Sequence, residues 1–317
     1  MTADFLREIG PFTIAGLVTG VVYALLAFGY AIIYRVLRLI NFAHAEVFMV
    51  GSFGALLVTQ ALGIVPFADA TLPRGFALLG AFCAIAVVAI VVSGALSAGL
   101  ELTVYRPLRR RGGSNLAALI ASLGCSLFLQ EVVAIWQGRD LVSFPVLFPK
   151  APIVEAGPLA IRNDQVLVFA LALACAGALY VFMRCSRFGR SIRAVALDQE
   201  AATLVGVNGA SVILLSFMLA GASAGVAATL YLMLYGSTSY LAGFAIGIKG
   251  FTAAVLGGMG SINGALLGGL LIGLLENYGA MVTGSQWQGI YAFVGLLAIL
   301  LLRPRGLISE RAIRARM

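Results

Sequence analysis

Long apolar stretches, separated by short polar breaks, make up most of this 317-residue chain. A helix needs about 20 mostly apolar residues to cross the hydrocarbon core of a bilayer. The pattern therefore predicts an all-α polytopic membrane protein with about 8–10 transmembrane helices, in one domain over residues 1–317. The predicted spans fall at residues 12–34, 47–62, 76–104, 116–136, 165–183, 210–235, 241–262, 265–281 and 287–302.

Composition supports a membrane location. Hydrophobic residues make up 61% of the chain and charged residues only 11%. No soluble domain of this size buries so much apolar surface. The 38 glycines fit helices that approach one another closely, because lipid provides no hydrophobic drive for helix association.

Arginines are distributed unevenly between two sets of loops. Residues 35–38, 106–111, 184–193 and the C-terminal tail contain fifteen arginines, whereas the N-terminus, 66–74 and 137–164 contain five basic residues in all. Cytoplasmic loops carry the excess of basic residues. We therefore expect nine spans, with the N-terminus outside and the C-terminus inside, provided that 241–262 crosses the bilayer completely.

The longest polar interval with helical character lies at 184–208. Asp198 is a suitable N-cap for a short helix over 199–205, Gly206 suits a left-handed C′ position, and Asn208 can cap the next span. This cytoplasmic loop is either a docking surface for a partner or a helix whose arginines meet anionic lipid headgroups. Its arginines are Arg184, Arg187, Arg190 and Arg193.

A second polar break, at 35–46, contains Asn41, His44 and Glu46. These side chains could cap the start of the next helix at the interface. They could also form a gate or part of a pathway, because polar groups near a span are costly unless they are used.

Acidic residues within or beside the predicted spans have several possible roles. Glu101 is expected to pair with Arg106 or to reach the interface, and Glu131 lies toward the outer end of its span. Glu276 either lines a translocation route or bonds to neighbouring helices. An ion-coupled carrier would also retain such an acid, so Glu276 alone does not decide the class of protein.

Glycines are concentrated at 247–269, in a segment that also contains Lys249 and Asn263. A glycine inside a helix costs about 1 kcal/mol relative to alanine, so a cluster favours either very close packing or a broken helix. Irregular backbone at membrane depth survives only where protein or a water-filled cavity covers it. We therefore keep a pathway role open for Gly257, Gly258, Gly260 and Asn263.

The sequence contains no recognisable catalytic set. It has one histidine, no phosphate-binding loop, no HExxH motif and no cysteine spacing typical of a metal site. We expect no enzyme activity, cofactor, metal or nucleic-acid partner. Any energy must then come from another chain, or from an ion gradient in a stand-alone carrier acting through Glu131 or Glu276.

Four stretches together resemble a known family. They are GLVTGVVYALLAFGYAIIYRVLRLINFAHAE at 16–46, FGRSIRAVALDQEAATLVGVN at 188–208, FTAAVLGGMGSINGALLGGLLIGLLE at 251–276 and RPRGL at 303–307. In this order they resemble the membrane permeases of bacterial ABC importers of the branched-chain amino acid type. Ala45 stands where this family usually has glycine.

The resemblance implies a role for the short helix at 199–205. Glu200, Ala201, Ala202 and Gly206 match an EAA-x3-G signature, the cytoplasmic coupling helix that docks on an ATPase subunit. Neighbouring Asp198, Arg190 and Arg193 would belong to the same coupling surface.

The resemblance also implies a transport role and a set of partners. The chain would be an inner-membrane permease that carries branched-chain or other hydrophobic amino acids by alternating access. Its partners would be two ATP-binding subunits, a second similar permease subunit, membrane lipid, and a periplasmic solute-binding protein that docks on outer loops such as 137–164. Permeases for urea, short amides or aromatic acids remain alternatives.

Overall fold

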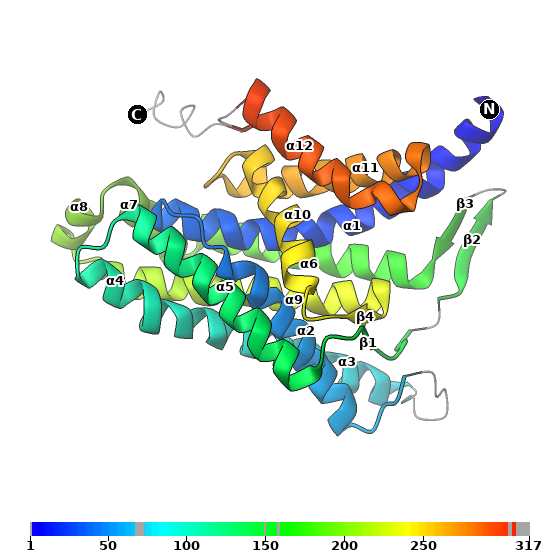
Figure 1. Ribbon diagram of the computed structural model, residues 1–317, viewed down its shortest axis with the longest axis horizontal. Coiled ribbons are helices and arrows are strands. Elements are labelled where there is room, and N and C mark those ends of the chain that lie inside the picture. The colour runs from blue at the N-terminus through cyan, green and yellow to red at the C-terminus, as the bar shows by residue number, and fades with distance from the viewer. Residues whose placement is uncertain are drawn as a thin grey trace.

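A computed structural model describes residues 2–66, 73, 75–148, 150–156, 159–303 and 306–308. Within these residues the chain is mainly helical, as the sequence predicts (Figure 1). The long helices are α1 (Thr2–Leu37), α2 (Ala43–Ala61), α3 (Phe76–Leu100), α5 (Asn115–Gln137), α6 (Asn163–Cys185), α9 (Gly209–Tyr235), α10 (Ala242–Gly257), α11 (Ile262–Thr283) and α12 (Gln288–Leu302). A π-helical turn (Glu101–Tyr105) joins α3 to α4 (Arg106–Arg110), and a 3₁₀ turn (Ser285–Trp287) precedes α12.

Seven of the described helical segments are long and apolar enough to span a membrane. All nine predicted apolar stretches are largely helical; the two outside the seven lie in α2 and α10. The helix in the predicted span 241–262 covers only the 16 residues of α10. At 1.5 Å per residue it is about 24 Å long, short of the ~30 Å hydrocarbon core.

The connecting segments gather at two opposite ends of the helical bundle. Figure 1 shows α4, α7 (Arg187–Leu197) and α8 (Gln199–Leu204) at one end, and the start of α1 with β2 and β3 at the other. The arginine-rich loops 106–111 and 184–193 therefore share one end. For these described segments, the separation agrees with the two sets of loops that the arginine count distinguishes.

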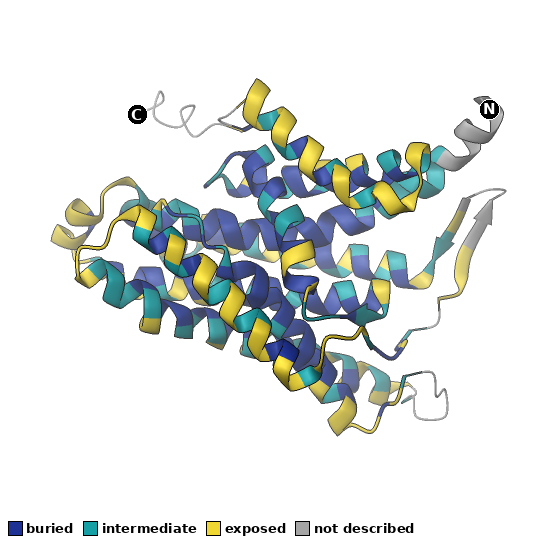
Figure 2. Cartoon of the chain, viewed as in Figure 1, coloured by how far each residue is buried: buried dark blue, intermediate teal, exposed yellow. Residues whose placement is uncertain are grey.

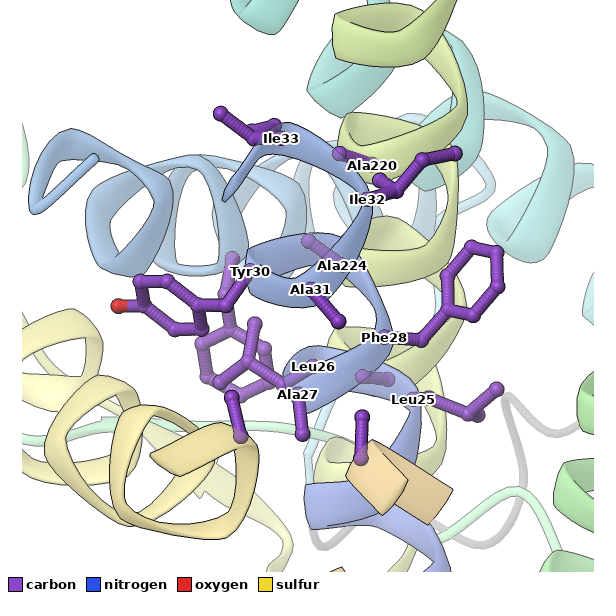
Figure 3. Packing of buried hydrophobic residues seen from close by; sticks show 14 of the residues in the cluster. Leu25, Leu26, Ala27, Phe28, Tyr30, Ala31, Ile32, Ile33, Ala220 and Ala224 are labelled. Atoms are coloured by element: carbon purple, nitrogen blue, oxygen red, sulfur yellow. The ribbon is translucent and has the colours of Figure 1, made fainter. Parts of the chain in front are cut away.

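Helix α1 forms the centre of the bundle. In the most apolar 18-residue stretch of α1, 94% of the residues are buried. The helix packs against α9, α10 and α11. Figure 3 shows Phe28 and Ile32 of α1 near Ala224 and Ala220 of α9. Small residues on α9 allow the two backbones to approach closely, as expected where helices associate in lipid.

Glycines also bring α1 against α11. A Cβ atom added at Gly20 would lie 2.9 Å from Leu270 Cα, and one added at Gly16 would lie 3.0 Å from Leu274 Cα. The distance at Gly20 is shorter than real Cβ atoms show and the one at Gly16 is tighter than most, so the absence of a Cβ at both positions allows the two helices to lie this close. This contact agrees with the prediction, made from the glycine content, that helices approach one another closely.

The outer helices have exposed apolar surfaces. In the most apolar 18-residue stretch of each of the segments that contain α3, α5 and α6, only 22% of the residues are buried. In the segment that contains α12 the share is 11%. Figure 2 shows exposed residues along α5 and α12. In a bilayer such surfaces contact lipid or another subunit.

Two small sheets lie in or near the segment 137–164. Strand β1 (Val142–Ser143) pairs with β4 (Ser237–Thr238), and β2 (Pro152–Ala156) pairs with β3 (Leu159–Arg162), both antiparallel. The described part of this loop therefore contains short extended segments.

Candidate functional site

The short helix α8 has well-defined caps at both ends. The Asp198 carboxylate accepts hydrogen bonds from the backbone N–H groups of Glu200 and Ala201, at 2.9 and 3.0 Å. At the other end Gly206 has φ of +85°, its N–H donates to Thr203 O, and the Val207 N–H donates to Ala202 O. This is a Schellman motif. The predicted N-cap and C′ glycine are confirmed.

Helix α8 presents both apolar and charged side chains to its surroundings. Leu204 is 89% exposed and Val205, its C-cap, is 78% exposed. Glu200 and Ala201 are also exposed, whereas Ala202 is only 4% exposed and packs against this chain itself. Of the two signature alanines, only Ala201 is therefore available to a partner.

Helix α7 has one buried face and one basic face. Gly189, Ile192 and Val195 are buried against the bundle. The Arg193 guanidinium donates to the carbonyls of Met183 at 2.6 Å and Arg184 at 3.4 Å, so it ties α7 to the last turn of α6. This gives Arg193 a structural role within the chain.

Arg190, by contrast, is exposed at the same end of the molecule as α8. Asn208 caps α9 by accepting from the Ser211 N–H at 3.2 Å, as predicted. We call the exposed part of α7 and α8, formed by Arg190, Glu200, Ala201, Leu204 and Val205, the α7–α8 surface.

The start of α2 lies in the interior of the bundle, contrary to one of the two sequence interpretations. Asn41 does not cap this helix, whose N-cap is Phe42 without a side-chain bond. Asn41 is 1% exposed and accepts a hydrogen bond from the Tyr105 hydroxyl at 2.6 Å. An interfacial capping role for Asn41 is therefore wrong, because a buried tyrosine occupies its side-chain oxygen.

His44 and Glu46 are also fully buried, both at 0% exposure. The His44 ring packs edge-on against Tyr30 and fits beside Gly29 of α1 because that position has no Cβ. Glu46 Oε1 accepts from the Ser126 hydroxyl of α5 at 3.2 Å, and Glu46 Oε2 lies against Gly243 of α10. The start of α2 thus joins three other helices.

Several polar atoms in this region have no hydrogen-bond partner of standard geometry among the described residues. They are both ring nitrogens of His44, Oε2 of Glu46 and Nδ2 of Asn41. A buried polar group without a partner is costly, and in membrane proteins such groups often mark a functional site. We call Asn41, His44 and Glu46 the α2 polar cluster.

A second buried polar group joins α1, α10 and α11. Glu276 is fully buried; its Oε1 forms an ion pair of 2.6 Å with Lys249 Nζ, and its Oε2 accepts from the Tyr23 hydroxyl at 2.9 Å. Lys249 also reaches the Tyr23 hydroxyl, at 3.2 Å. Glu276 therefore bonds to neighbouring helices, which was one of its two predicted roles.

The other two acids, Glu101 and Glu131, pair with arginines. Glu101 is fully buried and accepts two hydrogen bonds from Arg109, at 2.6 and 3.0 Å. Pairing with an arginine is confirmed, but the partner is Arg109 and not Arg106; Glu101 begins the π-helical turn, and Arg109 lies in α4, which follows it. Glu131 is exposed and pairs with Arg139 at 2.9 Å.

The glycine cluster combines close packing with a break between helices. Helix α10 ends at Gly257, and Gly258 and Gly260 have φ of +106° and +89°, values that favour glycine. A Cβ at Gly257 would clash with the backbone of Gly264 in α11. Asn263, in the first turn of α11, is exposed.

Some contact residues were not identified from the sequence. Tyr23, Tyr105 and Ser126 contact polar partners that are 253, 64 and 80 positions away in the chain. No local pattern predicts such pairs. Among the described residues, no group of three or more histidines, cysteines or acids could hold a metal ion.

Comparisons with known proteins give a consistent match. A family model described as "Branched-chain amino acid transport system / permease component" matches residues 12–302. The chain is 40% identical to the high-affinity branched-chain amino acid transport system permease protein BraD of Pseudomonas aeruginosa, over 93% of this chain and 94% of BraD. It is 36% identical to the corresponding protein LivH of Escherichia coli K12, over 93% of this chain and 94% of LivH. The solved structure of PsaBC from Streptococcus pneumoniae in complex with Fab aligns with the whole of both chains, but its TM-score of 0.48 and identity of 14% are too low to support a conclusion.

Proposed function

This chain belongs to the branched-chain amino acid transport permease family, and we propose that it is the membrane-spanning subunit of an ATP-driven importer for branched-chain or other hydrophobic amino acids. Two relatives named as permeases of branched-chain amino acid transport systems support this cargo. The permease itself performs no covalent chemistry. Urea, short amides or aromatic acids are less favoured cargoes.

The observation that carries the proposal is the exposed apolar end of α8. Leu204 and Val205 are 89% and 78% exposed on a capped helix at the arginine-rich end of the bundle. An exposed apolar patch with a polar rim is typical of a protein–protein contact. A stand-alone carrier has no need of such a surface, whereas a permease driven by separate ATPase subunits does.

Energy would pass from the ATPase to the spans through the α7–α8 surface. Arg193 ties α7 to α6, and Gly189 packs against the Met183 carbonyl, so a push on α8 would move the end of α6 as well. ATP binding would close two ATPase subunits, displace two such surfaces and favour one of two states of the spans.

The gate would include the α2 polar cluster. Its polar atoms that lack a standard hydrogen bond among the described residues would bond to water or solute once α2 moves away from α1, α5 and α10. We place Glu276, Gly257, Gly258, Gly260 and Asn263 in the same proposed pathway. Gly258 and Gly260, with their positive φ, form the break at which α10 and α11 would bend, while the ion pair of Glu276 with Lys249 holds the two helices together.

The proposed assembly contains two ATP-binding subunits and two permease subunits. The second permease subunit is either a homologous protein or another copy of this chain. A periplasmic solute-binding protein would supply the amino acid at the end that carries β2 and β3. The arginine distribution supports a bacterial inner membrane orientation with that end and the N-terminus in the periplasm. The C-terminal residues 309–317, which belong to the expected cytoplasmic tail, lie outside the described residues.

Co-purification tests this proposal. The full-length chain, expressed with its genomic neighbours and purified in mild detergent, should retain ATP-binding subunits. Leu204→Asp should abolish this association, because it places a charge in the apolar contact. Thr203→Asp, at an exposed neighbouring position, is the matched control for added charge. Equal retention by wild type and Leu204→Asp would refute the docking role of α8.

A further inference from the structure

An apolar hollow lies between α3, α6 and α9, and the transport proposal does not use it. Its volume is about 540 Å³, within the range of small-molecule sites. All its lining residues are apolar or glycine; they include Ile90, Val91 and Ala95 of α3, Phe182 of α6, and Met218 of α9. Val91 is 59% exposed and Met218 is 42% exposed, so the hollow is open to the surroundings of the bundle.

Arginines lie next to one end of this hollow. Phe188 of α7 also lines it, and its ring lies 6.0 Å from that of Phe182. Arg184 follows Phe182 by two positions, and Arg187 directly precedes Phe188; both are exposed. Arg184 donates to the Tyr180 hydroxyl at 2.9 Å, and neither arginine pairs with a carboxylate among the described residues.

These two features match the two parts of a phospholipid. An acyl chain fills an apolar hollow that opens toward the bilayer, and a phosphate accepts hydrogen bonds from arginine. The arginine-rich end of the bundle is also the end where headgroups of the cytoplasmic leaflet would lie. We infer that the hollow binds an acyl chain of an anionic phospholipid whose phosphate lies on Arg184 and Arg187.

A protein occupant fits the same surface less well. A helix with its side chains is about 10–12 Å wide, and a helix seated here would bury the two arginines without acidic partners from this chain. A phospholipid supplies both the apolar chain and the negative charge. Arg190 is not included, because it belongs to the α7–α8 surface.

Lipid binding to the purified full-length chain tests the inference. The chain is stripped of lipid in detergent, titrated with phosphatidylglycerol against an excess of phosphatidylcholine, and bound lipid is measured by native mass spectrometry. Each arginine near an anionic lipid raises the affinity for that lipid roughly fivefold. The double variant Arg184→Gln with Arg187→Gln should therefore weaken phosphatidylglycerol binding by about 25-fold. Arg110→Gln with Arg111→Gln removes the same charge from exposed positions of the same end and should have little effect.

A second pair of variants tests the hollow itself. Ala95→Trp fills it from an exposed lining position, whereas Ala84→Trp adds the same ring at an exposed position of α3 that does not line it. We expect loss of phosphatidylglycerol binding only with Ala95→Trp, or with Val91→Trp if Ala95→Trp fails to elute as a folded protein. Equal binding by the two tryptophan variants, or equal loss by the two double arginine variants, would overturn the inference.

Discussion

Gly206 shows how one residue can fix the shape of the proposed coupling surface. Its φ of +85° is costly for residues with a Cβ, yet a Cβ at this position would meet no atom within 4 Å. Any effect of substitution therefore comes from the backbone and not from a clash.

We predict that Gly206→Ala destabilises the end of α8 by about 1 kcal/mol and lowers transport-coupled ATPase activity. Gly206→Asn should retain more activity, because asparagine tolerates the left-handed region better. The measurement is ATPase stimulation in the assembled complex. Identical activity of the two variants would show that this backbone conformation is not required.

The ion pair of Lys249 and Glu276 is a second prediction at this scale. Lys249→Met leaves a fully buried carboxylate without its cation, which should destabilise the chain by about 3 kcal/mol. Adding Glu276→Gln should restore most of that loss, since glutamine is neutral and can still accept from Tyr23. Thermal unfolding of the purified single and double variants measures this. Additive losses would contradict a direct pairing.

Single residues were predictable from the sequence where their partners are local. Asp198 and Asn208 cap helices through bonds two or three residues away, and both caps were predicted. The hydrogen bond of Asn41 is not predictable in this way, because its partner Tyr105 is 64 positions away in the chain. The ion pair of Lys249 with Glu276 likewise depends on how α10 packs against α11.

At the scale of helices, glycine decides how closely α10 and α11 approach. A Cβ at Gly268 would clash with the carbonyl of Ala253 on α10. Gly177, on exposed α6, would meet nothing within 4 Å.

We predict that Gly268→Ala destabilises the chain by about 1–3 kcal/mol, although alanine favours helix. The control, Gly177→Ala, should be neutral or slightly stabilising. Thermal unfolding of both variants in the same detergent checks this. An unchanged unfolding temperature for Gly268→Ala would mean that α10 and α11 can move apart without loss of stability.

The hydrophobic pattern predicted helices well and their ends less well. All nine predicted apolar stretches are largely helical. The length and spacing of the apolar runs are enough to predict these helices. The pattern placed the start of α2 near residue 47, whereas the helix begins at Ala43 inside the bundle. That position depends on Gly29 and Gly243 leaving room for His44 and Glu46, which only the packed structure reveals.

For the whole molecule, the arrangement is a buried central helix surrounded by helices with exposed apolar surfaces. A tightly packed centre around α1 lies within outer helices whose apolar surfaces are exposed, and the α7–α8 surface lies at one end (Figures 1 and 2). Family membership and the two ends of the bundle follow from the sequence. The partners depend on surfaces of other chains, and so they stay proposals.

Uptake by the reconstituted complex tests the central claim most directly. The chain and its co-purified partners are placed in lipid vesicles, with the solute-binding protein and radiolabelled leucine outside. The proposal predicts accumulation of leucine only when the ATPase side has ATP, with no accumulation driven by a proton or sodium gradient alone. Uptake that follows an ion gradient and ignores ATP would contradict it.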